Sequence, residues 1–117
     1  MTVKSRKAKG RRFQQIVRDK FLSLDPGGLY ESTVMGEPGS DIKDPLTRLP
    51  WDYTECKNHE SWPSLDDVAD MMHRKKHDGT WVAIYGRNHC REPLVVLPFS
   101  TLGLMLVAWF KELDNED

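Results

Sequence analysis

Three residues have the types and the spacing of a metal-dependent site that acts on phosphates. Asp41 is followed, after thirteen residues, by the pattern Glu-x-Lys at Glu55 and Lys57. Residues 51–57 are expected to form a strand, and side chains two positions apart on a strand point to the same face. Glu55 and Lys57 are therefore expected to be neighbours, with Asp41 beside them on an adjacent strand.

This trio suits the hydrolysis of a phosphodiester. Two carboxylates on adjacent strands can share a hard divalent cation such as Mg²⁺, or Mn²⁺ in its place, because such ions prefer oxygen ligands. The cation lowers the pKa of a bound water and neutralises charge on a phosphate oxygen. The ammonium group of Lys57 can then stabilise the attacking hydroxide or the charged transition state. The competing interpretation is a solvated Glu–Lys pair on the surface of the sheet.

A second carboxylate competes for the role of Asp41. Asp44 lies three residues further along the chain and has the same chemistry. Asp41 is preferred because it follows Gly39 and Ser40 and directly precedes Ile42, in the short strand expected over residues 41–43.

Cysteines and histidines offer alternative metal chemistry. Cys56, His59, His89 and Cys90 could form a zinc site, but the adjacent pair His89 and Cys90 is not typical of zinc-knuckle spacing. Cys56 is also expected to face the core, opposite Glu55. The two histidines, each preceded by an asparagine, share a feature with HNH nucleases, although their spacing matches poorly.

The first twenty residues are strongly basic. They hold eight Lys or Arg and one acid, Asp19, whereas the whole chain has a net charge of -1. Basic clusters of this kind bind polyanions through phosphate contacts, and the alternative is a solvated, disordered terminus. Together with the second helix and the turn at residue 87, they give the expected DNA-binding residues, which are Lys4, Arg6, Lys7, Lys9, Arg11, Arg12, Arg74, Lys75, Lys76 and Arg87.

Hydrophobic periodicity and turn residues predict the elements that position these side chains. Helices are expected over residues 10–24, 64–76 and 100–111, and strands over 29–35, 41–43, 51–57, 81–86 and 93–98. Ser64 is expected to cap the second helix, and the apolar run at 81–86 to be a central strand. The order predicts an α/β fold with a mixed central β-sheet flanked by helices.

Length and composition indicate one domain. The 117 residues support a single modest core. Two cysteines cannot build a disulfide framework, and the first residues do not have the form of a signal peptide, so a cytoplasmic setting is expected. We expect a flexible basic arm at 1–9, the folded domain at 10–112 and an acidic tail at 113–117.

The most apolar run, residues 94–110, is interpreted as a buried strand followed by a buried helix. It is shorter than a membrane-spanning helix, and Pro98, Ser100 and Gly103 interrupt it, so no membrane association is expected. The helix is apolar nearly all round, which predicts cover on more than one side. That cover would be a second subunit in a homodimer or, alternatively, the core of a monomer.

The motifs taken together resemble the PD-(D/E)XK nuclease superfamily, and more narrowly its small phage and archaeal Holliday junction resolvase-like members. The resemblance runs over residues 9–19, 35–42 and 54–58, and the strands near 81–88 and 92–99 suit the family's last strands. It implies a restriction-endonuclease-like core in which Asp41 and Glu55 bind Mg²⁺ and Lys57 assists catalysis. It also implies cleavage of four-way or other branched DNA, in the host cytoplasm if the chain is phage-encoded.

Two positions depart from the family pattern. Ser40 stands where the family name has Pro, a common change in this superfamily. Gln14 stands where many relatives have a Glu in the first helix. Gln14 could touch a metal or its water through the amide oxygen, without adding charge, or it could simply pack at the edge of the helix.

The sequence therefore predicts a Mg²⁺-dependent DNA endonuclease, a Holliday junction resolvase that works as a homodimer because such an enzyme makes two symmetric cuts. Two alternatives stay open. One is a nuclease or nickase that ignores DNA branching. The other is a non-catalytic DNA-binding module on the same fold, which the departure at Gln14 favours.

Overall fold

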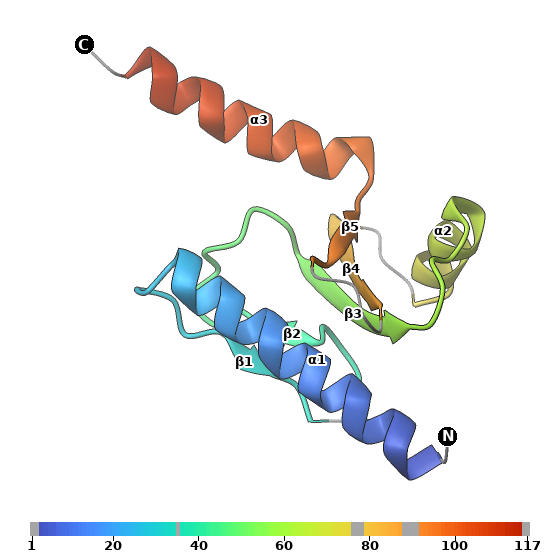
Figure 1. The fold of residues 1–117 in the computed structure, drawn as a ribbon. Helices are drawn as coiled ribbons and strands as arrows, with labels where there is room; N and C mark the ends of the chain where they lie inside the picture. Colours follow the sequence, from blue (N-terminus) through green and yellow to red (C-terminus); the bar gives the residue numbers. More distant parts are fainter. Residues whose placement is uncertain (1–2, 35, 76–78, 88–91, 116–117) are drawn as a thin grey trace.

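The computed structural model describes residues 3–34, 36–75, 79–87 and 92–115, and of residues 3–5 the backbone alone. Within these residues the chain forms three helices and two small sheets (Figure 1). The elements in order are α1 (Val3–Leu24), β1 (Glu31–Ser32), β2 (Ile42–Lys43), β3 (Tyr53–His59), α2 (Leu65–Arg74), β4 (Trp81–Arg87), β5 (Leu94–Val96) and α3 (Phe99–Asp114). The order of helices and strands is the predicted one.

The larger sheet has the order β3-β4-β5. β3 and β4 are parallel and are connected through α2, with Glu55 opposite Ala83, whereas β5 is antiparallel to β4. A parallel pair requires a crossover connection, and α2 supplies it. The prediction that residues 81–86 form a central strand is confirmed.

The smaller sheet is the antiparallel pair β1 and β2. The expected single central sheet is therefore wrong, because this pair does not continue the ladder of β3. One backbone hydrogen bond from Asp41 N to Thr54 O, of 2.8 Å, links the two sheets. Beside it, the side chains of Ser40 and Asp41 accept the N–H groups of Thr54 and Cys56, so side chains replace a regular ladder there.

The larger sheet is covered on both faces, by α1 on one and α2 on the other (Figure 1). Successive side chains of a strand point to opposite faces, so β3 and β4 each contribute to two cores. The core under α1 contains Phe13, Val17, Tyr30, Ile42, Cys56, Val82 and Ile84. The core under α2 contains Val68, Met72, Ala83 and Tyr85. Cys56 faces the core opposite Glu55, as expected.

α1 approaches the sheet closely at Gly86. A Cβ atom added to Gly86 would lie 2.5 Å from Cε1 of Phe13, which is closer than side chains tolerate. The absence of a side chain at this position lets the Phe13 ring approach β4 closely. This contact fixes the height of α1, and with it the position of Gln14, over the sheet.

α1 is longer than expected. It begins at Val3, so residues 3–9, which we expected to form an arm separate from the helix, are helical in the structure. Gly10 does not interrupt the helix, because its neighbours Ala8, Lys9 and Arg11 are good helix formers. The basic residues of this segment therefore lie along a helix.

α2 starts as the sequence predicts. The hydroxyl of Ser64 accepts a hydrogen bond from the N–H of Asp67 at 3.1 Å. Asp66 and Asp67 lie in the first turn, where negative charge favours the helix dipole.

α3 is the element that departs most from expectation. It leaves the sheet after β5 and runs away from the rest of the described chain (Figure 1). Thr101 is fully buried and donates to the carbonyl of Trp81 at 3.1 Å, but Trp109 and Phe110 are 58% and 54% exposed. The expected burial of this strand and helix is therefore wrong for the single chain, and so is the alternative that the helix forms the centre of a monomer's core.

We call the exposed part of β5 and α3 the C-terminal apolar surface. It consists of Leu94, Val95, Phe99, Leu102, Leu104, Met105, Leu106, Val107, Trp109, Phe110 and Leu113. In the described part of the chain, no helix combines the length and the apolar character needed to cross a membrane.

Candidate active site

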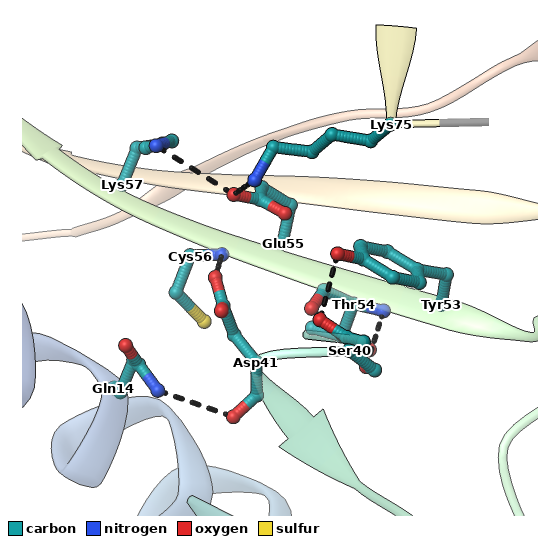
Figure 2. A network of polar contacts seen from close by, with 10 residues as sticks. Gln14, Ser40, Asp41, Tyr53, Thr54, Glu55, Cys56, Lys57 and Lys75 are labelled. Carbon is teal, nitrogen blue, oxygen red and sulfur yellow. Dashed lines mark hydrogen bonds and ion pairs between the residues drawn. The ribbon is translucent and has the colours of Figure 1, made fainter. Parts of the chain in front are cut away.

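The predicted catalytic residues meet in one pocket of about 360 Å³. Gln14 comes from α1, Asp41 from the residue before β2, and Glu55 and Lys57 from β3. Figure 2 shows Gln14 and Asp41 on one side of the β3 ribbon and Glu55 and Lys57 on the other. The complete lining is Gly10, Gln14, Val34, Gly36, Glu37, Asp41, Glu55, Cys56, Lys57, Asn58, His59 and Lys75.

Asp41 is held against the edge of β3 by hydrogen bonds to Thr54 and Cys56, and it is also bound to Thr33. Its backbone N–H donates to the carbonyl of Thr54 at 2.8 Å, and its own carbonyl accepts from Thr33 N at 2.9 Å. The Asp41 carboxylate accepts the N–H of Cys56 through Oδ2 at 2.7 Å (Figure 2). The carboxylate is therefore held at one height along β3, next to Glu55.

Ser40 holds the turn before β2 against β3. Its hydroxyl accepts the N–H of Thr54 at 2.9 Å and lies 2.7 Å from the carbonyl of Ile42. Tyr53 supports the same turn, because its hydroxyl donates to the carbonyl of Gly39 at 2.7 Å. Gly39 has φ of 104°, a left-handed conformation that favours glycine. A proline at position 40 could not make the hydroxyl contacts that hold this turn on β3.

Glu55 is a charged residue in a buried position. It is 1% exposed, and its Oε1 atom lies 2.8 Å from Nζ of Lys75 and 3.7 Å from Nζ of Lys57. The other carboxylate oxygen, Oε2, is buried and has no hydrogen-bond partner among the described residues. The carboxylate is thus neutralised on one side by two lysines and left with an unused acceptor on the other.

The electrostatics of Asp41 also favour a cation. Burial raises the pKa of its carboxyl above the ordinary value, and the N–H of Cys56 opposes that shift. The negative charge of Glu55 raises the Asp41 pKa further, while Lys75 and Lys57 lower it. The two carboxylates therefore repel each other across the pocket, and a bound cation would relieve the repulsion.

Gln14 is buried, at 5% exposure, and its amide group has a clear structural role. Its Nε2 donates to the carbonyls of Thr33 at 3.1 Å and Asp41 at 3.2 Å, and lies 3.3 Å from the hydroxyl of Ser32. A glutamate has no N–H to offer these oxygens. The amide therefore ties α1 to the backbone that carries Asp41.

Asp44 lies apart from the pocket, and the zinc and HNH alternatives include residues that the structure does not describe. Asp44 lines a different pocket, and its Oδ2 accepts the N–H of Leu49 at 2.7 Å. Cys56 is buried in the core and burial raises the pKa of its thiol, so it is a poor zinc ligand. His89 and Cys90, the other half of the zinc alternative, lie outside the described residues, as does the asparagine at position 88 that the HNH alternative needs.

A hydrated divalent cation fits the donor set. Asp41 and Glu55 both line the pocket, and the buried Oε2 of Glu55 is an acceptor without a partner. In the ranges that the structure describes, no group of three His, Cys, Asp or Glu is arranged to hold an ion. The protein would thus supply two carboxylate ligands and leave several coordination positions to water, as is usual for Mg²⁺ in proteins.

The basic residues expected to bind DNA fall into separate groups. Arg87 donates to the carbonyl of Glu60 at 3.2 Å and lies 5.4 Å from the ring centre of Trp62. Arg74 is exposed, Lys76 and the side chain of Lys4 lie outside the described residues, and Lys75 points into the pocket. The remaining residues lie on the first turns of α1, of which Lys9 is half-buried and Arg6, Lys7, Arg11 and Arg12 are exposed.

Lys75 is the functional residue whose position the sequence did not reveal. It was expected to contact DNA from the outer face of the second helix, yet it reaches Glu55. The signal lies in the topology: because β3 and β4 are parallel, α2 returns the chain to the start of β3, and its last residues pass beside Glu55.

No protein-family model, curated protein or solved structure matches this chain. Membership of the nuclease superfamily therefore stays a prediction. What can be argued about function comes from the geometry of the pocket.

Proposed function

We propose that this protein is a Mg²⁺-dependent DNA endonuclease with a restriction-endonuclease-like core. The observation that carries the proposal is the meeting of Asp41, Glu55 and Lys57 in one pocket. Asp41 and Glu55 are fourteen positions apart in the sequence, so the fold, and not their closeness along the chain, brings them together. A surface Glu–Lys pair, the competing interpretation, does not account for a glutamate that is 1% exposed.

The arrangement of the elements supports the same proposal. α1 precedes the strand pair β1 and β2, and Asp41, the residue just before β2, is hydrogen-bonded to Thr54 of β3. The unit β3-α2-β4 then places Glu55 and Lys57 on the face that α2 covers. These are the positions that the resemblance to PD-(D/E)XK nucleases implies.

Each residue has a defined role in this proposal. Asp41 and Glu55 hold the cation, which when bound supplies an activated water and neutralises charge on the phosphate. Lys57 is one-third exposed, so its ammonium group can contact a phosphate oxygen that enters the pocket. Gln14 positions the backbone of Asp41 rather than the metal itself.

DNA would reach the pocket along the first turns of α1. Gly10 and Gln14 line the pocket, so the exposed basic residues of the preceding turns continue outward from its rim. Lysine and arginine side chains neutralise phosphates without reading sequence. This geometry supports binding of the DNA sugar-phosphate backbone next to the proposed cleavage site.

We further propose a homodimer that cuts four-way DNA junctions. The C-terminal apolar surface includes β5, an edge strand that pairs only with β4 in the described chain. Exposed apolar edges and helices of this size mark protein–protein contacts. A second copy would cover the surface and supply a second, symmetric cleavage site.

Cleavage by purified protein tests the catalytic proposal. Wild type is expected to cut labelled four-way junctions in Mg²⁺ and to be inactive in excess EDTA, with Ca²⁺ supporting binding alone. Asp41→Asn, Glu55→Gln and Lys57→Ala should each abolish cleavage and leave DNA binding largely intact. Asp44→Asn is the matched control, because this carboxylate lies close in sequence but outside the pocket. Cleavage that persists in Glu55→Gln or in EDTA would overturn the proposal.

Sedimentation at micromolar concentration, combined with junction and linear-duplex cleavage, tests the homodimer. Trp109→Glu with Phe110→Glu should convert the dimer to a monomer, because both side chains are more than half exposed in the single chain. Leu65→Glu, an exposed leucine in the first turn of α2, is the control. A wild-type monomer without junction preference contradicts both parts, and a dimer without that preference indicates a general DNA endonuclease.

A second candidate function is a non-catalytic DNA-binding module. The bonds of Gln14 and the pairing of Glu55 with two lysines favour it, because both occupy groups that a metal site would use. The cleavage experiment separates the two functions. A module would bind the DNA substrates equally in Mg²⁺ and EDTA and cut none of them.

A further inference from the structure

Two lysines from different elements approach the same oxygen of Glu55. Nζ of Lys75, at the C-terminal end of α2, is 2.8 Å from Oε1, whereas Nζ of Lys57, on β3, is 3.7 Å away (Figure 2). Lys75 is the nearer and makes the hydrogen bond. One buried carboxylate thus has a second, stronger cationic partner besides the lysine of the Glu-x-Lys motif.

The backbone of Lys75 is fixed, but its side chain can change conformation. Its backbone N–H donates to the carbonyl of Met71 at 3.1 Å, so the main chain is fixed at the helix end. The side chain is 37% exposed, and a lysine stem can redirect its ammonium by rotation about four bonds. The Glu55 carboxylate, in contrast, is buried and cannot follow.

A divalent cation at the unpartnered Oε2 of Glu55 would share one carboxylate with Lys75, which is bound to Oε1. Two cations on one carboxylate repel each other, so the metal and the ammonium group each weaken the binding of the other. A phosphate entering the pocket changes this balance, because it offers Lys75 another anionic partner. The same event that brings DNA to the site would therefore release Glu55 for the metal.

We propose that Lys75 is a positioning residue that couples DNA binding to metal binding. It holds the Glu55 carboxylate in place until a phosphodiester draws its ammonium group away, and the cation then binds Asp41 and Glu55. This inference rests on the proposed metal-dependent function. It gives the site a means of loading metal preferentially when substrate is present.

The coupling is measurable as an affinity ratio. Calorimetric titration of the full chain with Ca²⁺, with and without a short DNA duplex, avoids cleavage, and a titration of the duplex alone is subtracted. In the wild type, DNA should tighten Ca²⁺ binding by at least about fivefold, the lower end of typical couplings between sites. Linkage requires Ca²⁺ to tighten DNA binding by the same factor.

Substitutions at position 75 assign the coupling to this lysine. Lys75→Met and Lys75→Gln should each bind Ca²⁺ about fivefold more tightly than wild type without DNA, and should lose the effect of DNA. Lys75→Arg, which keeps the charge, should restore the wild-type behaviour. Lys111→Met is the matched control, because it removes one exposed lysine that does not line the pocket.

Unchanged or weaker Ca²⁺ binding in Lys75→Met and Lys75→Gln overturns the inference, as does equal tightening by DNA in all variants. If the variants fail to fold, the wild-type titration still decides, since an absence of coupling contradicts the role of Lys75. The proposed function fails differently: a wild type that binds no divalent ion and cuts no DNA removes the metal site altogether. A wild type that cuts DNA without the coupling removes only the role of Lys75.

Discussion

α2 and α3 relate to the same three-stranded sheet in opposite ways, because α2 covers one face of it whereas α3 runs away from it after β5 (Figure 1). α2 confines its apolar residues to one stripe, and Val68 and Met72 are buried against β4. α3 carries apolar residues in every direction, and Thr101 is its one buried residue. A helix with one apolar stripe can be satisfied by one sheet, whereas an apolar helix without a polar face needs a further partner.

The ends of the two helices show the same difference. α2 begins with the hydroxyl cap of Ser64, which satisfies a backbone N–H locally. α3 follows Pro98, which makes no side-chain cap bond. Most helix stability in proteins comes from packing rather than from propensity. α2 is therefore stabilised by contacts within this chain, whereas α3 depends on what covers it.

The largest effect is expected from a matched pair of methionines. Met72→Ala should lower the free energy of unfolding by about 2–5 kcal/mol, because it leaves a cavity under α2. Met105→Ala on α3 should change it by less than about 0.5 kcal/mol in the monomer, because this side chain is exposed there. Denaturant unfolding at low protein concentration measures both.

The same two substitutions also test whether a second copy covers α3. If a second copy covers α3, the cost of Met105→Ala should appear as the protein concentration rises, since association stabilises the folded chain by mass action. Equal costs for both methionines at a dilution where the chain is monomeric would contradict the difference between the helices.

A matched pair of glycine substitutions should change the free energy of unfolding less, and in opposite directions at the two positions. Gly86→Ala forces a methyl group onto the Phe13 ring and should destabilise the chain by about 1–3 kcal/mol. Gly103→Ala on α3 meets nothing within 4 Å and should stabilise the helix by about 1 kcal/mol. Thermal unfolding measures both. A destabilising Gly103→Ala would mean that another chain approaches α3 closely at this position.

The smallest expected effect is a loss of folding stability at low pH, through Asp25. Asp25, just after α1, is bound by Nε of Arg48 at 2.6 Å and by the hydroxyl of Tyr30 at 2.7 Å. The hydrogen bond from Arg48, followed by that from Tyr30, lowers the pKa of Asp25 from 3.8 to about 2. The folded pKa is below the unfolded one, so this stabilisation is present above pH 3.8 and is lost as the pH falls through about 2.

Asp25→Asn should therefore be less stable than wild type at pH 6, and the difference should shrink as the pH falls from about 4 to about 2. Unfolding curves across this range measure the change, and Asp70→Asn on the exposed face of α2 serves as the control. A constant difference at all pH values would mean that Asp25 acts through packing and not through its charge.

Local patterns in the sequence predicted the order of the elements, the Ser64 cap and the face of β3 that carries Glu55. These features depend on neighbours within a few residues, and the alternation of a strand is sufficient to assign its faces. The split into two sheets was not predictable in this way. It follows from Ser40 and Asp41 binding the edge of β3 through their side chains, a contact between segments fourteen or fifteen residues apart.

The roles of Lys75 and Gln14 were also beyond local pattern. Lys75 reaches Glu55 only because β3 and β4 pair in parallel, and strand direction is set by the whole sheet. Gln14 binds carbonyl groups that are 19 and 27 residues away in the chain. The exposure of α3 was missed because an apolar sequence indicates a need for burial without saying which molecule provides it.

The position of Cys56 allows thiol labelling to report on transient opening between α1 and the sheet. Its backbone N–H holds the carboxylate of Asp41, while its thiol is buried under α1. Burial raises the pKa of that thiol, so a thiol-reactive dye should modify it slowly in the closed structure and faster when α1 lifts from the sheet. In a Cys90→Ser chain, the labelling rate would therefore count the openings of the scaffold around Asp41. Slower labelling in the presence of Mg²⁺ and DNA would show, without any measurement of cleavage, that ligands clamp the helix onto the strand.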